Sequence, residues 1–484
     1  MVCKGTEPPY IQTGVFNGVS KENFTLEVPE SAIVRYQTAP GWKDFKRISA
    51  YRNLSVVPNT ANALNSRATR DFVLYADDEW EVTECPEWIV LSQTSGKGKT
   101  AMRLSFSQMP QGDRREGKVV FKLKDNDYRV AMTVSQHDYK YAEDEILTLQ
   151  SASEGCGINL VFLGDGYNAV DISDGKLLTD INKAVENFFA IEPYRTYKKY
   201  FNVYTGISVS PESGIGSINT IVYNRFNTTA KGGVTLGGRN DSDVAEIFRY
   251  ACKAPTVNED NLSRTLVVMI PNTSDYGGIT YMYDDGSAIA YCPKSDYGYP
   301  LDFRGVIQHE AGGHGFGKLG DEYIYHNTFV DACGCSCCGH AGELAAAREK
   351  GWYENLSLSG KANEVPWSHL LYHEKYSGLV DIFEGGFMHN RGVYRSEYNS
   401  CMNNEIPYYN TISRESIVRR IKAYAGEEYS FEDFVAKDKV ENLPETAAAM
   451  SKSGIKAHSK TDMRNEHHHS PIFMGKRPNF DIDE

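Results

Sequence analysis

The sequence predicts an all-β sandwich domain followed by a larger α/β or α+β domain. Short runs of alternating apolar and polar residues, separated by Gly, Ser and Asp turns, fill residues 71–137, which is typical of a sandwich. Beyond residue 146, continuous apolar runs alternate with stretches of helical periodicity, which is typical of helices packed on a sheet. With 484 residues, the chain is long enough for two or three domains.

These patterns divide the chain into four predicted regions. Residues 1–65 show no sustained period and are either unassigned or part of the β domain. The β-sandwich is predicted over 66–140 and the α/β domain over 146–430. Residues 431–484 have little apolar periodicity and are predicted to be a loosely ordered tail.

The individual elements follow from the same periodicities. In the sandwich, the predicted strands include Phe72–Tyr75, Lys118–Lys122 and Val130–Val134. In the α/β domain, the predicted strands are Asn159–Leu163, Phe201–Tyr204 and Thr265–Ile270, and the predicted helices are Leu177–Phe189, Val244–Cys252 and Ile417–Ala425.

The composition is that of a globular chain. Hydrophobic residues make up 41% and charged residues 24% of the sequence, near the averages of folded domains. The 64 acidic and 51 basic residues give a formal net charge of −13, which disfavours nucleic acid as a partner. No apolar run approaches the roughly 20 residues that span a bilayer, so we predict no transmembrane segment.

The cysteines are unevenly distributed. Four of the ten, Cys333, Cys335, Cys337 and Cys338, fall within one short loop, which is tighter than the separated pairs of structural zinc sites. The loop therefore favours local disulfides in an oxidising compartment, or unused thiols, over a second metal site. The first residues show no export signal, and Cys3 is either the lipid-bearing cysteine of a lipoprotein whose leader has been removed or a terminal thiol.

The strongest chemical pattern is His309-Glu310-Ala311-Gly312-Gly313-His314, on a helix for which Asp302 is a candidate N-cap. Zinc hydrolases bring two imidazoles to one helix face, beside a carboxylate that deprotonates water. Here the histidines are five residues apart, which in a regular α-helix turns the second about 140° away from the first. A π-bulge at Gly312-Gly313 restores a shared face, because one i to i+5 turn absorbs the extra residue.

A catalytic zinc ion usually has three protein ligands and keeps one position for water. Beyond His314, several glycines let the chain leave the helix before Asp321-Glu322. Asp321 is the predicted third ligand and Glu322 the alternative, with the other carboxylate supporting the ligands through hydrogen bonds. His389 is a further competitor. If no metal binds, these side chains form only a polar cluster at a capped helix.

The stretch from His309 to Tyr323 resembles the signature of the IgA-peptidase family of bacterial zinc metallopeptidases. That signature is His-Glu-x-Gly-His followed by Phe-Gly, Leu and Asp-Glu-Tyr, and this chain departs from it by one extra residue before His314. Further similar stretches are Phe162–Tyr167, Phe188–Ala190, Glu192–Tyr194, Phe201–Tyr204, Ser210–Gly214, Phe383–Gly385, Gly392–Arg395, Cys401–Met402 and Ser413–Glu415. The resemblance extends over residues 155–425.

The resemblance implies a metzincin-like catalytic domain. His309, His314 and Asp321 would bind Zn²⁺ in it, and Glu310 would act as the general base. We therefore predict a zinc-dependent metalloendopeptidase, in which Glu310 assists the attack of water on peptide bonds.

The resemblance also suggests roles around the metal. Met402 would form the floor under the metal ion, where the alternative is ordinary core packing. Tyr394 is a candidate for stabilising the oxyanion of the tetrahedral intermediate. Tyr276–Tyr281 is a candidate edge strand that pairs with an extended substrate.

A second, looser resemblance concerns the β region. Trp80, Pro86–Ile89, Ser95-Gly96, Arg114–Gly117 and Thr133–Gln136 look like a BACON module. Such modules occur at the N-termini of Bacteroidetes surface enzymes, and their family name implies glycan contact. The alternative is a spacer domain whose tryptophans belong to the core.

Together the two resemblances imply an extracellular or cell-surface protein, lipid-anchored or periplasmic as alternatives. Its substrate would be an extracellular protein or glycoprotein, with immunoglobulin A as the candidate that the family name supplies. A first alternative function is a catalytically inactive adhesin or glycan-binding protein, in which the inserted residue has abolished metal binding. A second is a zinc amidase or glycan-trimming hydrolase, which would bind zinc but would not cleave proteins.

Overall fold

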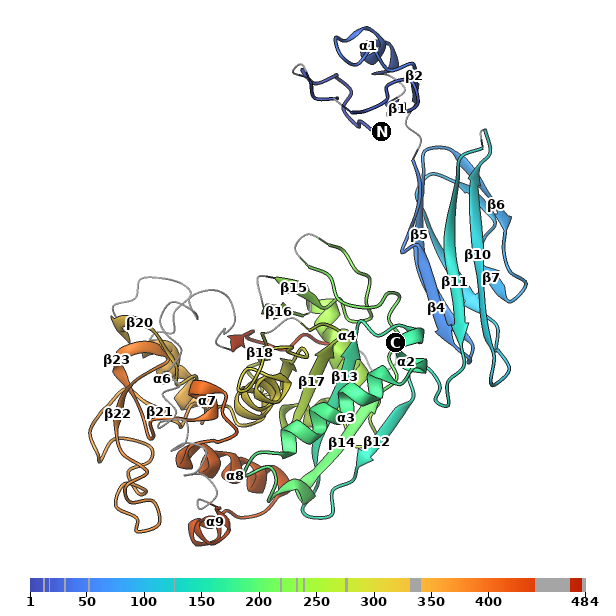
Figure 1. Ribbon diagram of the computed structural model, residues 1–484. Coiled ribbons are helices and arrows are strands. Elements are labelled where there is room, and N and C mark those ends of the chain that lie inside the picture. Colours follow the sequence, from blue (N-terminus) through green and yellow to red (C-terminus); the bar gives the residue numbers. More distant parts are fainter. Residues whose placement is uncertain are drawn as a thin grey trace. The chain divides into compact units, whose positions relative to one another are not determined.

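The computed structural model describes the chain except for residues 12–13, 17, 30–31, 51–52, 126, 218–219, 232–233, 238–239, 275–276, 331–340, 440–470 and 481–484. The described residues form two compact units, Met1–Asp138 and Tyr139–Glu484 (Figure 1). The predictions for the loop Cys333–Cys338 fall outside the described residues.

The first unit begins with a small subdomain around an aromatic cluster. β1 (Thr25–Val28) pairs in parallel with β2 (Arg47–Ala50), and α1 (Ile33–Thr38) connects them in sequence. The ring of Trp42 meets the rings of Phe16 and Tyr36 edge to face, each at a centroid distance of 5.1 Å. Sequence periodicity misses these elements because each is only four to six residues long.

The remainder of the first unit is a β-sandwich. One sheet has the strand order β4-β11-β10-β6-β8, and the other has the order β3-β5-β9-β7. The strands are β3 (Leu54–Val57), β4 (Thr60–Leu64), β5 (Ala68–Ala76), β6 (Glu79–Glu84), β7 (Ile89–Leu91), β8 (Ser95–Lys97), β9 (Thr100–Phe106), β10 (Arg114–Leu123) and β11 (Arg129–His137). The three strands predicted from the sequence lie within β5, β10 and β11 and are confirmed.

Apolar side chains from both sheets form one core. Trp80 is fully buried in it, edge-on to Phe121 at a ring-centroid distance of 6.0 Å, so the core role considered for this tryptophan is confirmed. Trp88 is partly buried under the guanidinium of Arg115, which lies 4.6 Å from its ring centroid. The first sandwich strand begins at Leu54, before the predicted boundary at residue 66.

The second unit is built on a seven-stranded sheet with the order β12-β14-β13-β17-β19-β18-β24. The strands are β12 (Ile146–Gln150), β13 (Ile158–Asp165), β14 (Phe201–Gly206), β17 (Thr265–Pro271), β18 (Ile279–Met282), β19 (Ala288–Tyr291) and β24 (Ile472–Phe473). Four adjacent strands of this sheet are parallel to one another, in the order β14, β13, β17 and β19. Every residue of β13 and β17 is buried. The continuous apolar runs in the sequence predict this burial, because a parallel strand is covered on both faces.

Helices flank this sheet, as Figure 1 shows for α3 beside β13 and β14. α3 (Lys176–Phe189), α4 (Asp241–Ala251) and α8 (Thr411–Ala425) confirm the three predicted helices. The other helices are α2 (Ala169–Ser173), η2 (Lys198–Tyr200), η3 (Glu259–Arg264), α5 (Phe303–Val306), η4 (Ile307–Phe316), α6 (Ala341–Glu349), α7 (Cys401–Asn404) and α9 (Phe431–Lys437).

Two smaller sheets complete the second unit. β15 (Thr229–Lys231) and β16 (Val234–Leu236) form an antiparallel pair. β23 (Met388–Arg395) pairs with β20 (Ile324–Phe329), β21 (Leu356–Ser357) and β22 (Phe383–Gly386).

The position of β18 corrects the edge strand predicted for Tyr276–Tyr281. β18 pairs antiparallel with β19 on one side and parallel with β24 on the other, where Tyr281 pairs with Ile472. Ile279–Met282 is completely buried, so the prediction of a free edge is wrong at Tyr281, and Tyr276 lies outside the described residues. The physical reason is that a distant two-residue strand covers this edge, and so short a strand leaves no periodic signal.

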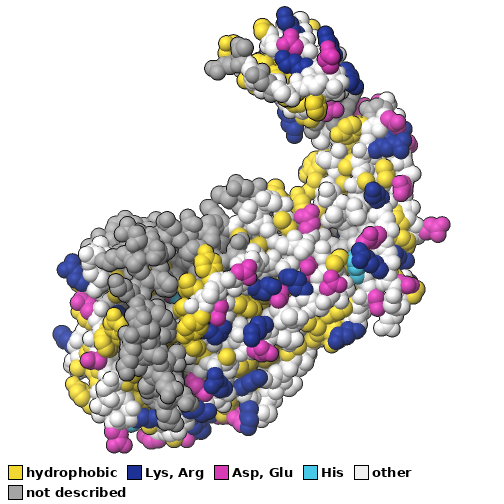
Figure 2. Space-filling view, viewed as in Figure 1, with side chains coloured by type: hydrophobic (Ala, Val, Ile, Leu, Met, Phe, Trp, Pro, Cys, Tyr) yellow, Lys and Arg dark blue, Asp and Glu magenta, His cyan; other side chains and the backbone are white. Residues whose placement is uncertain are grey.

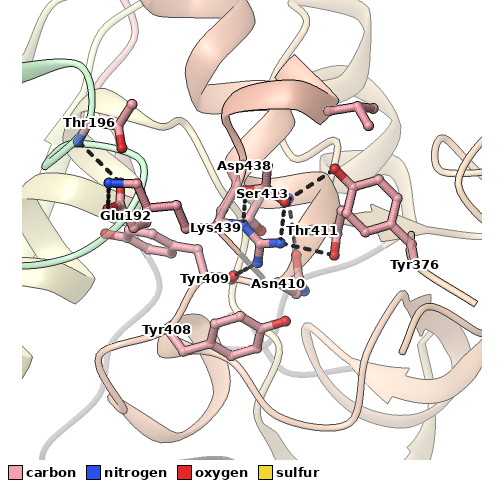
Figure 3. A network of polar contacts seen from close by, with 12 residues as sticks. Glu192, Thr196, Tyr376, Tyr408, Tyr409, Asn410, Thr411, Ser413, Asp438 and Lys439 are labelled. Carbon is pink, nitrogen blue, oxygen red and sulfur yellow. Dashed lines mark hydrogen bonds and ion pairs between the residues drawn. The ribbon is translucent and has the colours of Figure 1, made fainter. Parts of the chain in front are cut away.

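The first residues of the predicted tail form the helix α9 rather than a loosely ordered segment. α9 is held to α8 by the guanidinium of Arg414, whose Nε and a terminal nitrogen lie 2.7 and 2.8 Å from the two carboxylate oxygens of Asp438. Both side chains are buried, and Tyr376 adds a hydrogen bond to Asp438 (Figure 3). Burial opposes the charge of Arg414, but the neighbouring Asp438 raises the pKa of its guanidinium.

Asp438→Ala is expected to destabilise the protein by about 3–5 kcal/mol, because it leaves the buried guanidinium of Arg414 without its paired carboxylate. The exposed carboxylate of Asp433 on the same helix, paired with Lys437, provides the matched control, and its removal is expected to cost less than about 1 kcal/mol. Denaturant unfolding of both variants measures the difference. Equal losses would contradict the assigned role of the buried pair.

The surface of the second unit carries both signs of charge. Figure 2 shows basic and acidic side chains interspersed over the face that it presents. No helix in the described ranges is long and apolar enough to cross a membrane.

Candidate active site

The site helix begins as an α-helix and continues as a π-helix. The carboxylate of Asp302 accepts a hydrogen bond from the backbone N–H of Gly305 at 3.0 Å and caps α5, which confirms the predicted cap. The chain then enters η4, a π-helix over Ile307–Phe316. The predicted bulge is therefore a longer stretch of π-helix than one turn.

The two central glycines of η4 are required by close packing. A Cβ atom on Gly312 would lie 2.4 Å from the hydroxyl of Tyr409, and one on Gly313 would lie 2.2 Å from the sulfur of Met402. The backbone carbonyl of Gly312 accepts hydrogen bonds from the N–H of Gly317 at 2.9 Å, an i to i+5 contact, and from the hydroxyl of Tyr194 at 2.5 Å. These contacts satisfy backbone groups that the wide helix would otherwise leave unpaired.

The side chains of His309, His314 and Asp321 meet in one buried cluster. His309 Nε2, His314 Nε2 and Asp321 Oδ1 are 3.1 Å apart in all three pairs. Ligand atoms around tetrahedral Zn²⁺, with bonds of about 2.0–2.1 Å, lie roughly 3.3–3.4 Å apart. Within the described part of the chain, this is the group of three side chains whose spacing can hold a metal ion.

Each imidazole is fixed through its second nitrogen. His309 Nδ1 lies 3.2 Å from the carbonyl oxygen of Cys401, and His314 Nδ1 lies 2.8 Å from that of Leu319. Because a carbonyl oxygen can only accept a hydrogen bond, each Nδ1 carries a proton, and a ring without a second proton presents the Nε2 lone pair to the cluster. Two lone pairs and a carboxylate oxygen that face one another favour a cation among them.

The pKa shifts within the cluster also indicate that it favours a positive charge. Burial alone would lower the pKa of His309, but the hydrogen bond and charge of Asp321 raise it to about 10. Burial opposes the charge of Asp321, yet the charge of His314 and the hydrogen bonds from both imidazoles hold the pKa of its carboxyl well below its usual range. The cluster therefore stabilises positive charge, supplied by a proton or a metal ion.

Glu310 is buried beside this cluster. Burial raises the pKa of its carboxyl, and the charges of His314 and His309 oppose that shift. The hydroxyl of Thr280, on β18, donates to Glu310 Oε2 at 2.8 Å. A carboxylate with a raised pKa can both accept a proton from water and return it, which is the chemistry of a general base.

Glu322, the alternative third ligand, is not a member of the cluster of His309, His314 and Asp321. Its Oε1 accepts hydrogen bonds from Asn355 at 2.8 Å and Asn410 at 2.6 Å, and its Oε2 accepts from Ser400. Burial raises the pKa of the Glu322 carboxyl to about 7, although these hydrogen bonds oppose the shift. Through these hydrogen bonds, Glu322 connects the loop that carries Asp321 to Asn355, Asn410 and Ser400.

The other competitor, His389, is also engaged elsewhere. It is fully buried, and its Nδ1 lies 3.0 Å from the hydroxyl of Thr328. The phenol of Tyr394 lies 3.5 Å from Glu384, and its ring packs against Gly360. Neither side chain belongs to the three-residue cluster of His309, His314 and Asp321, so neither the ligand role of His389 nor the oxyanion role of Tyr394 gains support.

Met402 is buried directly against the site helix, through its contact with Gly313. The backbone of the same segment is tied to the ligand loop, because the N–H of Glu322 donates to the carbonyl of Met402 at 2.8 Å. The position of Met402 beside η4 agrees with the prediction, while its role as a floor under the metal remains a prediction.

Glu322→Ala is expected to weaken metal binding by about 10–100-fold, because it removes the acceptors that hold the Asp321 loop. Competition with a chromophoric chelator measures this affinity, and circular dichroism verifies that the variant is folded. Glu384→Ala is the matched control, since the Glu384 side chain is exposed and lies outside the network. Wild-type affinity in Glu322→Ala would show that the network does not position the ligand.

Sequence reasoning missed the partners that orient the site. Thr280 lies 30 residues from its partner Glu310, Asn355 lies 33 residues from its partner Glu322, and the carbonyl of Cys401 lies 92 residues from His309. Only the fold brings these groups together. A polar residue inside an otherwise apolar strand, such as Thr280 in β18, could have indicated such a contact, because a buried hydroxyl needs a hydrogen-bond partner.

An α/β domain with a buried His-His-Asp cluster and an adjacent glutamate has the composition of a metal-dependent hydrolase site. Residues 147–331 match the model of the family described as IgA Peptidase M64, so this part of the chain is similar to that family of peptidases. The match includes the cluster and Glu310 and ends at residue 331, so the resemblance predicted for later residues stays a prediction. No curated protein matches the chain.

Solved structures show only weak similarity. A Bacteroides ovatus GH5 xyloglucanase in complex with a XXXG heptasaccharide is 15% identical, with 22% of this chain and 26% of that chain covered and a TM-score of 0.17. A Porphyromonas gingivalis protein of unknown function is 16% identical, with 23% and 58% covered and a TM-score of 0.16. A Clostridium perfringens family 123 glycoside hydrolase is 8% identical, with 49% and 48% covered and a TM-score of 0.15. None of these similarities identifies a BACON module in the first unit.

Proposed function

We propose that this protein is a zinc-dependent metalloendopeptidase. His309, His314 and Asp321 would hold the metal ion, and Glu310 would be the general base. The observation that carries the proposal is the triangle of two Nε2 atoms and one carboxylate oxygen at 3.1 Å, with each Nδ1 engaged by a backbone carbonyl. The family match over residues 147–331 supports peptide bonds as the target.

Zn²⁺ in this site would supply Lewis acidity toward water and the scissile carbonyl. Glu310 accepts one proton from the attacking water and later donates it to the nitrogen of the leaving amine, which restores its carboxylate. Each turnover consumes one water and releases a carboxylate and an amine. The buried position of Glu310 suits this exchange, since its raised pKa lowers the cost of the protonated state.

The metzincin-like fold is part of the proposal. The site helix carries both histidines and the base, and the chain then turns so that Asp321 reaches the same cluster. The packing of Met402 against Gly313 supports this comparison.

The substrate is proposed to be an extracellular protein or glycoprotein. The printed description of the matched family supplies immunoglobulin A as the candidate to test first. We propose an extracellular or cell-surface location for the protein, and glycan contact through the β-sandwich remains a hypothesis to be tested with the substrate.

The proposal is tested by the hydrolysis of fluorescent casein and of purified immunoglobulin A. We expect cleavage that is abolished by 1,10-phenanthroline and restored by added Zn²⁺. A protein that binds zinc but cleaves an N-acetylated amino acid or a glycan instead would support the amidase or glycan-trimming alternative. A protein that binds neither zinc nor these substrates would support the adhesin.

A further inference from the structure

Glu310 contacts the segment where β18 begins through two alternate residues, Gly278 just before the strand and Thr280 within it. A Cβ atom on Gly278 would lie 2.5 Å from Cγ of Glu310, so only glycine leaves room for the glutamate stem at that position. Two residues further along, the hydroxyl of Thr280 lies 2.8 Å from Glu310 Oε2 and 3.1 Å from the backbone carbonyl oxygen of Glu310. Residues i and i+2 of an extended segment face the same side, so Gly278 and Thr280 both face the side chain of Glu310.

We infer that Thr280 is a positioning residue for Glu310, an inference that rests on the proposed function. Thr280 is completely buried, and β18 is paired on both sides at the neighbouring Tyr281, so the hydroxyl is carried by rigid backbone. Its hydrogen bond fixes one carboxylate oxygen and leaves Oε1 for proton exchange with water. In the described part of the chain, no other side chain hydrogen-bonds this carboxylate.

The geometry explains why such a contact is needed. Glu310 has several side-chain torsions, and a general base acts only within hydrogen-bond reach of the proton that it accepts. Gly278 leaves room for the stem of Glu310, and Thr280 donates the hydrogen bond that orients its carboxylate, so both contacts are made with Glu310 itself. Thr280 is therefore expected to affect the rate of the chemical step without affecting metal binding.

The test compares Thr280→Val, which keeps the shape of the side chain but removes the hydroxyl, with Thr280→Ser, which keeps the hydroxyl. Thr280→Val is expected to lower kcat by about 10–100-fold, with KM and zinc affinity within about threefold of wild type. Thr280→Ser is expected to retain kcat within about fivefold, because the donor is preserved. In a Glu310→Asp background, removal of the hydroxyl is expected to have a much smaller effect on kcat, because the two residues act as a unit.

A crystal structure of zinc-loaded Thr280→Val provides the readout that does not depend on activity. We expect the carboxylate of Glu310 to be displaced or to occupy more than one position. The inference is overturned if the carboxylate keeps its place, if zinc is lost together with activity, or if the serine variant is as impaired as the valine variant. A wild-type protein that binds zinc but cleaves no protein would count against the proposed function alone, and the crystal structure would still decide the role of Thr280.

Discussion

Glu310→Gln is expected to reduce kcat for casein by about 10²–10⁴-fold while the protein keeps its zinc. The amide has nearly the shape of the carboxylate and still accepts the hydrogen bond from Thr280, but it cannot take a proton from water. His309, His314 and Asp321 are unchanged, so the metal-binding cluster stays intact. Steady-state kinetics and metal analysis of the same preparation measure both quantities.

The controls for this variant separate chemistry from folding. Its thermal unfolding should resemble that of the wild type, and KM should change little, because the substitution removes proton transfer rather than substrate contacts. Activity close to that of the wild type would exclude Glu310 as the base. Loss of zinc from Glu310→Gln would mean that the carboxylate belongs to the metal site.

Asp321→Ala is expected to weaken zinc binding by more than about 100-fold, because contacts outside a ligand set already contribute about 10–100-fold. The variant loses one of the three ligand atoms and also leaves the two Nε2 atoms, 3.1 Å apart, without the negative charge that favours a cation. Activity should fall in parallel with bound zinc. Isothermal titration of the metal-free protein with Zn²⁺ measures the affinity.

Asp284→Ala provides the matched control for Asp321→Ala. Asp284 is an exposed aspartate whose partner is Lys350, and its removal should leave zinc affinity and activity unchanged. If Asp321→Ala retains wild-type zinc affinity, the third ligand must be another residue and the proposed ligand set is wrong.

The sequence predicted the structure best at long periodic helices and strands and at the closely spaced reactive side chains of the site. The runs at β13 and β17 and the apolar stripe of α3 are long enough to show their periods. The five-residue spacing of His309 and His314 required a wider helix, and the structure has a π-helix there. The need for both histidines to reach one metal ion predicted the wider helix, which helix propensity alone would not have predicted.

The sequence was uninformative where distant segments meet. The two residues of β24 pair with β18 across about 190 residues of chain, and the buried partner of Arg414 lies in a region predicted as tail. Likewise, the choice between Asp321 and Glu322 depends on Asn355, Ser400 and Asn410, which surround one carboxylate only after folding. Such contacts depend on topology, which local patterns do not encode.

The most direct test of the central claim is the metal content of the wild-type protein, purified without chelators and measured by inductively coupled plasma mass spectrometry beside His314→Ala. We predict close to one zinc ion for each wild-type chain and almost none for the variant, because His314 supplies one of the three ligand atoms of the cluster. A wild-type protein that contains no zinc and cannot be reconstituted with it would contradict the assignment of a zinc peptidase.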